Sequence, residues 1–312
     1  SWRRTPWRLI VKYFIFETHV TLYSDFLVKN KLSKSDIMTD KKREEDQVIK
    51  EKLAPKQFIK HPINGTKYAL LVSSAKGGVG KSTVAVNLAF ALQNLGMKVG
   101  ILDADVYGPS LPKLMKLNEK PKSEDGKALI PLEKYSAQCM SMGFLVDEQT
   151  PMIWRGPMVI SALKTMTQKV LWKDRDIIII DMPPGTGDTQ LTFAQEVKVD
   201  GAIIISTPQD LALLDVKRGI QMFEKTGVKI LGLIDNMSFF EGDDGKKYKI
   251  FGEGGVEKTA KEFNKEFLGH LPLHQDLRDA TEKGDPLTRS NPNHKVSKLF
   301  EDIAKKILLS LK

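Results

Sequence analysis

A glycine-rich loop at residues 75–80 stands between two segments of different pattern. The preceding residues 68–74, YALLVSS, are a short apolar run without polar alternation, which is typical of a strand buried on both faces. The following residues repeat apolar side chains at helical spacing and end at Gly96. Those side chains are Val84, Leu88, Ala91, Leu92 and Leu95. With the next apolar run, KVGILDAD (98–105), this order predicts a right-handed strand–helix–strand unit.

Three more apolar runs follow farther along the chain: DIIIIDM (176–182), GAIIISTP (201–208) and KILGLIDNM (229–237). Short buried strands that alternate with helical segments predict an α/β fold whose mostly parallel sheet is covered by helices on both faces. The chain of 312 residues is 41% hydrophobic, enough for one such domain. We therefore predict a single domain over residues 67–312, after a basic N-terminal extension over residues 1–66.

The positive charge of the chain is concentrated in this extension. Residues 1–66 hold 14 Lys and Arg against 8 Asp and Glu, which leaves only +3 of the net +9 for the rest. We therefore expect no nucleic-acid partner. Residues 1–24 are consistent with an organellar transit peptide, or residues 1–37 with sequence upstream of a start at Met38. We expect a cytoplasmic location, with the mitochondrial matrix as the alternative.

Two further observations limit the class of protein. The apolar run from Leu9 to Val28 contains Lys12, Glu17 and other polar residues that are costly in a bilayer, so we predict no stable membrane insertion. Cys139 is the single cysteine, so no intramolecular disulfide can form.

The glycine-rich segment SSAKGGVGKST (73–83) nearly matches the phosphate-loop pattern G-x-x-x-x-G-K-S/T, with Ala75 at the first glycine. The backbone N–H groups of such a loop converge on phosphate oxygens at a helix N-terminus. We expect Lys81 to reach the β- and γ-phosphates and Ser82 to bind Mg²⁺. The predicted nucleotide-binding residues of the loop are Gly77, Gly78, Val79, Gly80, Lys81, Ser82 and Thr83.

Carboxylates end two of the predicted strands. Asp181 closes the run IIIID and is typical of the aspartate that holds Mg²⁺ through water in P-loop NTPases. The residues after it, MPPGTGD, contain glycines suited to a loop that moves with the γ-phosphate. Asp103 and Asp105 end another strand and lie on one face of it.

Four motifs in this order, AKGGVGKST, DADVYGPS, MPPGTGD and IDNMS, resemble the MinD-like, deviant Walker A P-loop ATPases. The resemblance is strongest to the Mrp/ApbC-type iron–sulfur cluster carriers and runs from about Lys67 to the C-terminus. In that superfamily the loop is K-G-G-x-G-K-S/T, so Ala75 is allowed and Lys76 is required.

The resemblance also implies roles for individual residues. Lys76 would reach across a homodimer interface to the nucleotide of the other subunit, and Asp105 would orient the attacking water. Asn236 would read adenine, which implies ATP. The chain is thus expected to be a homodimeric ATPase with Lys76, Lys81 and Asp105 as its catalytic residues.

One expected motif is missing. Carriers of this branch typically follow N-M-S with a C-P-x-C pair, and two such pairs bind a 4Fe–4S cluster across the dimer. Here Gly242 and Gly245 stand at about those positions, within EGDDGKKY, which predicts a tight hairpin. The oxygens of Asp243 or Asp244 are poor replacements for thiolates. We identify no iron–sulfur ligands, although the resemblance implies cluster assembly with client apoproteins as partners.

Two apolar segments remain. The C-terminal segment 294–312 predicts an amphipathic helix, which we expect to pack against the sheet rather than on a membrane. The methionine-rich residues 150–166 are expected to be core rather than a partner surface. Two other functions stay open: a MinD- or partition-type positioning ATPase at membrane or DNA, and an iron-free regulatory ATPase.

Overall fold

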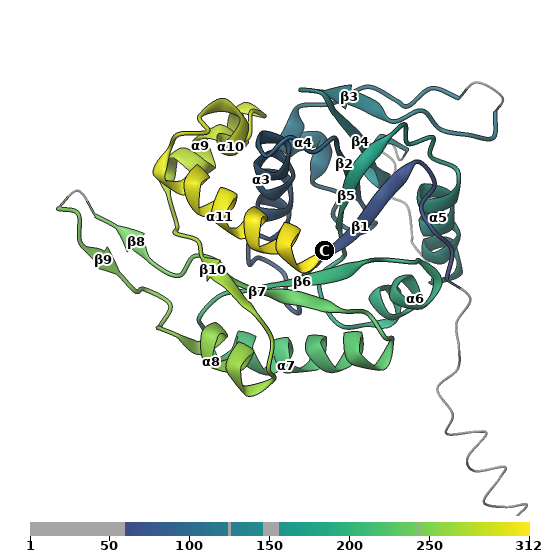
Figure 1. The fold of residues 1–312 in the computed structure, drawn as a ribbon. Helices are drawn as coiled ribbons and strands as arrows, with labels where there is room; N and C mark the ends of the chain where they lie inside the picture. Colours follow the sequence, from purple (N-terminus) through teal and green to yellow (C-terminus); the bar gives the residue numbers. More distant parts are fainter. Residues whose placement is uncertain (1–59, 124–125, 146–155, 243) are drawn as a thin grey trace, which may run out of the picture. The chain divides into compact units, whose positions relative to one another are not determined.

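The computed structural model describes residues 60–123, 126–145, 156–242 and 244–312 (Figure 1). Within these residues, an eight-stranded sheet forms the centre, in the order β10-β7-β6-β1-β5-β2-β4-β3. Its neighbouring strands are parallel except for the antiparallel pair β3 and β4. The strands are β1 (Thr66–Ser73), β2 (Val99–Asp103), β3 (Leu132–Lys134), β4 (Ala137–Ser141), β5 (Arg175–Asp181), β6 (Gly201–Ser206), β7 (Ile230–Asp235) and β10 (Phe267–His270). The predicted α/β class is confirmed.

The central strands are buried along almost their whole length. Residues 177–180 of β5 are fully buried isoleucines, and β5 lies between β1 and β2 with Ile179 opposite both Leu70 and Ile101. Because both faces are covered, these strands show no polar alternation in the sequence. Each of the five apolar runs forms one strand, as predicted. The short strands β3 and β10 were not predicted.

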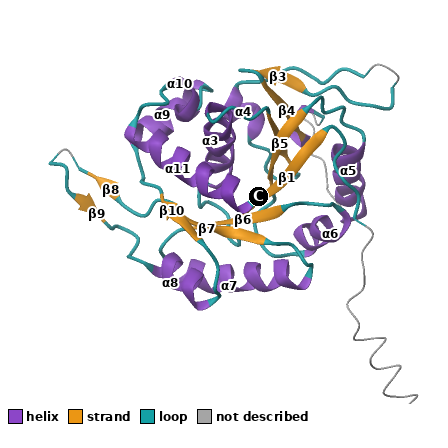
Figure 2. Cartoon of the chain, in the orientation of Figure 1, coloured by secondary structure: helices purple, strands orange, loops and turns teal. Residues whose placement is uncertain are grey.

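The helices form two layers, one on each face of the sheet (Figure 2). One layer contains α3 (Lys81–Asn94), α4 (Leu111–Met115), α9 (Gln275–Lys283), α10 (Leu287–Ser290) and α11 (Lys295–Ser310). The other contains α5 (Gly156–Gln168), α6 (Asp188–Glu196), α7 (Asp210–Lys225) and α8 (Gly255–Glu262). A short 3₁₀ helix, η1 (Met142–Phe144), follows β4, and a separate hairpin is made of β8 (Phe240–Glu241) and β9 (Lys247–Tyr248).

The C-terminal helix α11 packs against α3 and β10. Its buried apolar side chains are Val296, Phe300, Ile303 and Ile307. The predicted packing is therefore confirmed, and this face is not available to a membrane. None of the helices in the described ranges is long and apolar enough to cross a membrane. The apolar run from Leu9 to Val28 lies outside those ranges.

A few residues before Thr66 already contact the domain. His61 pairs with the end of α6, since its N–H donates to Glu196 O and its carbonyl accepts the N–H of Lys198, both at 2.8 Å. Ile63 is buried in the core. The boundary between the extension and the domain stays a prediction.

In the methionine-rich segment, Met166 is fully buried, as expected of core. Met158 is 43% exposed, however, so the expectation fails for that side chain. Met152, Ile153 and Trp154 lie outside the described residues.

Candidate functional site

The predicted site residues meet at the carboxyl edge of the sheet. β1, β5 and β2 are parallel neighbours, and the register places Asp181 opposite both Val72 and Asp103. Parallel strands present their carboxyl ends on one edge, which is where α/β proteins bind ligands. The loop after β1 therefore lies beside the carboxylates that end β5 and β2.

The loop between β1 and α3 depends on glycines at two positions. Gly78 and Gly80 have φ angles of 80° and 78°, in the left-handed region that penalises a side chain. At Gly80 there is also no room, because a Cβ would lie 2.5 Å from Nδ2 of Asn236. The loop leads directly into Lys81, the first residue of α3, so its N–H groups stand at a helix N-terminus.

Lys81 forms a buried ion pair with Asp181. Its ammonium group contacts Asp181 Oδ1, and both side chains are almost fully buried. The same ammonium lies 3.4 Å from Ser82 Oγ. Burial raises the pKa of the Asp181 carboxyl, and the nearby Lys81 charge opposes this rise. Lysine, hydroxyl and carboxylate are thus gathered beside the loop, and their roles toward a phosphate and Mg²⁺ stay predictions.

Asp103 shapes the segment that follows β2. Its carboxylate accepts the N–H groups of Asp105, Ser110 and Leu111 at 3.2, 2.8 and 3.0 Å, and the hydroxyl of Ser141 at 2.9 Å. Burial, together with the charge of Asp181, raises the pKa of Asp103 to about 7. Since these four donors occupy both oxygens, Asp103 holds the backbone in place rather than facing a ligand.

Asp105 has a different environment from Asp103. Its Oδ1 accepts the N–H groups of Tyr107 and Gly108, each at 3.1 Å, which closes a tight turn around the side chain. The residue is 8% exposed, and its charge contributes to raising the pKa of Asp181, so the two carboxylates are near each other. The two aspartates predicted as a pair thus divide into one that holds the backbone, Asp103, and one whose charge acts on Asp181, Asp105.

Asn236 reaches the loop from the end of β7. Its Nδ2 donates to the carbonyl of Val79 at 2.7 Å, and its backbone N–H donates to Ser206 O at 2.8 Å. The side chain is buried against the glycine loop. The structure therefore brings this residue to the loop across a sequence separation of more than 150 residues.

Lys76 is exposed on the outside of the loop. Its carbonyl accepts the hydroxyl of Ser74 at 2.9 Å, which fixes the backbone at this position. Among the described residues, its ammonium forms no ion pair. The role expected of Lys76 at a dimer interface stays a prediction.

Gln190 was missed in the sequence. This buried residue of α6 accepts the hydroxyl of Ser73, at the end of β1, at 2.9 Å and donates its amide N–H to Pro183 O. Gly185 N–H also donates to Ser74 O at 2.9 Å. Gln190 therefore ties the loop after Asp181 to the strand before the phosphate loop. A polar residue one turn into a helix is not distinguishable from a solvent-facing one by sequence alone.

The hairpin has glycines at about the positions where the cysteines are expected. Gly242 N–H donates to Lys246 O at 2.9 Å, and Gly245 has a φ angle of 74°. A Cβ at Gly242 would lie 2.9 Å from both Asp244 Oδ1 and the ring of Tyr248. The predicted tight hairpin is confirmed, and Asp243 lies outside the described residues.

Cys139 offers no replacement for those thiolates. It lies on β4, where it is fully buried, and burial raises the pKa of its thiol to about 12. The usual ligand of an iron–sulfur cluster is a cysteine thiolate, and a thiol with a raised pKa stays protonated at neutral pH. The described residues therefore do not fit a bound cluster.

Comparison with known proteins identifies related sequences over most of the chain. The sequence model described as NUBPL iron-transfer P-loop NTPase matches residues 65–308. The Arabidopsis thaliana "Iron-sulfur protein required for NADH dehydrogenase, mitochondrial" is 48% identical over 252 residues, 80% of this chain and 80% of that protein. The Escherichia coli "Iron-sulfur cluster carrier protein" is 47% identical over 251 residues, 80% of this chain and 68% of that protein.

Solved structures show the same architecture. A nucleotide-binding protein from Archaeoglobus fulgidus in complex with ADP has a TM-score of 0.63 and 36% identity, over 71% of this chain and 88% of that one. The septum site-determining protein MinD from Pyrococcus horikoshii has a TM-score of 0.58 over 78% of this chain and 96% of that one. At 20% identity, the likeness to MinD concerns the fold alone.

Proposed function

Because the chain belongs to the NUBPL iron-transfer family of P-loop NTPases, we propose that it binds and hydrolyses ATP as a homodimer in iron–sulfur protein maturation. In this role it would act as a carrier or scaffold for client apoproteins. The observation that carries the proposal is the convergence of Lys81, Asp181 and Asn236 on one glycine loop. These residues come from three separate places in the chain: the start of α3, the end of β5 and the residue after β7.

The loop and its neighbours suit a nucleotide phosphate with Mg²⁺. The hydroxyl of Ser82 and the carboxylate of Asp181 are hard oxygen ligands of the kind that Mg²⁺ prefers, and both lie beside the Lys81 ammonium. Bound Mg²⁺ would neutralise charge on the phosphates. Lys81 would then exchange its contact with Asp181 for a phosphate oxygen, while the loop N–H groups bind the remaining oxygens.

Asn236 supports adenine as the base. Val79 O can only accept a hydrogen bond, so the atom of Asn236 that faces it must be the amide nitrogen. The amide oxygen is left as an acceptor for a ligand. The N6 amino group of adenine is a donor and can pair with it, whereas the O6 carbonyl of guanine is an acceptor and cannot.

Lys76 and Asp105 complete the proposed reaction. Asp105 lies near Asp181 and would orient the water that attacks the γ-phosphate. Lys76, exposed and unpaired within the described chain, would reach the nucleotide of the partner subunit and stabilise charge in the transition state. Hydrolysis would then require the dimer, because neither subunit supplies every charge alone.

The iron-related part of the proposed function rests on the relatives of this chain. Relatives named as cluster carriers support a setting in iron–sulfur maturation. The hairpin of this chain, however, has Gly242 and Gly245 at about the positions of the expected cysteines, so it supplies no thiolate there. The proposed function therefore does not include a cluster bound by this hairpin. An iron-free regulatory ATPase is the second candidate function, and the same hairpin favours it.

A positioning ATPase is less well supported than the other two candidate functions. The sequence feature that favours this function is the amphipathic C-terminal helix. That helix packs against α3 and β10. A cytoplasmic location, with the mitochondrial matrix as the alternative, remains a proposal; one relative is named as mitochondrial.

The ATPase proposal is tested with Lys81→Ala. ATP turnover is expected to fall by about a hundredfold or more, because the variant loses the charge that contacts the β- and γ-phosphates. Turnover is measured by phosphate release with Mg²⁺ present. Lys98→Ala is the control, since Lys98 forms an exposed ion pair with Asp174. Turnover near the wild-type rate in Lys81→Ala would reject the site.

A further inference from the structure

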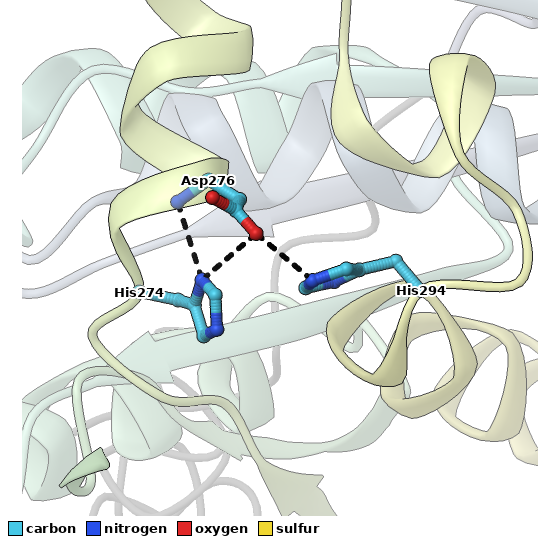
Figure 3. Close-up of side chains that lie close together, drawn as sticks. All are labelled: His274, Asp276 and His294. Atoms are coloured by element: carbon cyan, nitrogen blue, oxygen red, sulfur yellow. Dashed lines mark hydrogen bonds and ion pairs between the residues drawn. The ribbon is translucent and has the colours of Figure 1, made fainter. Parts of the chain in front are cut away.

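Two histidines and one carboxylate gather where α9 and α11 begin (Figure 3). His274 precedes the first residue of α9, Asp276 lies in its first turn, and His294 precedes α11. The centroids of the two imidazole rings are 5.0 Å apart. The side chains of His274 and His294, here called the histidine pair, are only 17% and 16% exposed.

Each member of the histidine pair caps a helix through the same ring atom. Nδ1 of His274 accepts the backbone N–H of Asp276, and Nδ1 of His294 accepts that of Val296, both at 3.2 Å. A neutral imidazole has one N–H, so with Nδ1 accepting, the hydrogen must be on Nε2. Nε2 of His294 lies 3.1 Å from Asp276 Oδ2, to which it can donate this hydrogen. The contacts therefore fix the tautomer of both rings.

The Nε2–H tautomer of both rings bears on whether the three side chains bind a metal ion or a proton. Nitrogen and oxygen atoms of the three side chains lie within 4.8 Å of one another, a donor set of the kind that binds Zn²⁺. A ligating nitrogen needs a free lone pair, and its ring partner normally donates a hydrogen bond. Here the Nδ1 lone pairs already face backbone N–H groups, so a metal ion would bind only at the loss of the caps.

A proton reaches the same lone pairs and changes their role. Protonation puts hydrogen on Nδ1, where it faces a backbone donor at the positive end of a helix, so the cap is lost. The charged groups around His274 are Asp276, His294, Lys295 and Glu241. Burial lowers the pKa of His274, and Asp276 acts in the opposite direction. Acid therefore exchanges the caps for ion pairs with Asp276.

The residues beside the histidine pair hold the base of the β8–β9 hairpin. Leu273, one residue before His274, donates its N–H to Phe239 O at 2.8 Å. Lys295, one residue after His294, forms an ion pair with Glu241 of β8 at 2.7 Å. Both lysine and glutamate also line a cavity of about 370 Å³ beside the hairpin. The helix starts and the hairpin are thus mechanically connected.

We propose that the histidine pair is a proton-sensitive latch that holds the base of the β8–β9 hairpin at neutral pH and loosens it on acidification. The direction of the pH effect follows from the caps, because Nδ1 can accept a backbone N–H only while the imidazole ring is neutral. Because its pKa is lowered, folded His274 binds fewer protons than unfolded His274 below the ordinary histidine pKa of about 6.5. The stability from its cap is complete above that pH and is lost as the pH falls below it.

Hydrogen exchange of the full chain, corrected for intrinsic rates, tests the latch at about pH 7.5 and about pH 5.5. In the wild type, the amides of Asp276, Val296 and Leu273 are expected to lose protection by about tenfold at the lower pH, as for the loss of a helix cap. The variant His274→Asn with His294→Asn keeps cap acceptors that cannot be protonated, and should lose this pH dependence. His61→Asn, outside the cluster, should keep it.

Nitrogen NMR of the wild-type imidazoles provides a readout that does not depend on how well the variants fold. Both rings should be in the Nε2–H tautomer at neutral pH. A Nδ1–H tautomer in either ring, or equal protection at both pH values, overturns the latch. Stoichiometric binding of Co²⁺ or Zn²⁺ that His294→Asn abolishes also overturns it, because the ring nitrogens would then be available to a metal ion.

Discussion

At the scale of single residues, the two left-handed glycines of the phosphate loop have different surroundings. Gly78 has a φ angle of 80° and no atom within 4 Å of its would-be Cβ, whereas the Cβ at Gly80 would lie 2.5 Å from Asn236 Nδ2. An alanine would therefore be strained in its backbone at both positions. At position 80 its Cβ would also clash with the Asn236 side chain. The motif itself does not distinguish them.

This difference predicts unequal effects of alanine. Gly78→Ala is expected to lower the free energy of unfolding by about 1–2 kcal/mol, the cost of a left-handed alanine. Gly80→Ala should cost about 1–3 kcal/mol more, because it displaces Asn236 from Val79 O. Urea unfolding monitored by circular dichroism measures both. Equal losses in the two variants would mean that the bond between Asn236 and Val79 contributes little.

At the scale of elements, the hairpin is the part of this chain that differs from the expected pattern of its family. Its turn is closed by Gly242 and Gly245, and Asp244 accepts hydrogen bonds from Lys246 N–H and the hydroxyl of Tyr248 at 3.0 and 3.1 Å. These hydrogen bonds hold the turn in place without a bound metal ion. The hairpin is consequently ordered by its own side chains.

Anaerobic reconstitution tests this interpretation. Incubation of the wild-type protein with iron and sulfide is expected to give no stable cluster, because soft thiolate ligands are absent from the turn and the Cys139 thiol is buried. Iron counting and visible absorption after desalting provide the measurement. A cluster that stays with the protein in a near-stoichiometric amount per dimer would show that other ligands bind it.

At the scale of the whole molecule, the proposed active site is divided between two chains. Lys81 acts on the nucleotide of its own subunit and Lys76 on that of the partner. Inactive Lys76→Ala and Lys81→Ala variants should therefore complement each other, since each mixed dimer contains one complete site. After random exchange of subunits, an equimolar mixture is expected to recover about a quarter of the wild-type turnover per chain.

Phosphate release by the mixture, compared with each variant alone, measures this recovery. Mixing Lys81→Ala with itself at the same concentration is the control. A mixture no more active than its components, although it forms mixed dimers, would place Lys76 in its own subunit's site.

Much of the fold could be predicted because parallel strands buried on both faces leave a direct record in the sequence. The runs that became β1, β2, β5, β6 and β7 are continuous apolar segments, and α3 ends where Gly96 predicts. β10 was missed because FLGH is short and contains glycine and histidine, so its pairing with β7 depends on the sheet already being present. The partial exposure of Met158 is likewise a matter of which neighbours cover it.

The sequence by itself determined the phosphate loop, the strand-end carboxylates and the absence of thiolates from the hairpin, because these depend on residue type and local spacing. Only the tertiary structure decided how each polar group is used. It showed that Asp103 accepts hydrogen bonds from three backbone N–H groups and a hydroxyl, that Gln190 ties the loop after Asp181 to β1, and that the histidine pair caps two helices. Hydrogen bonds between residues distant in the chain depend on the position of both partners, and no local pattern contains that information.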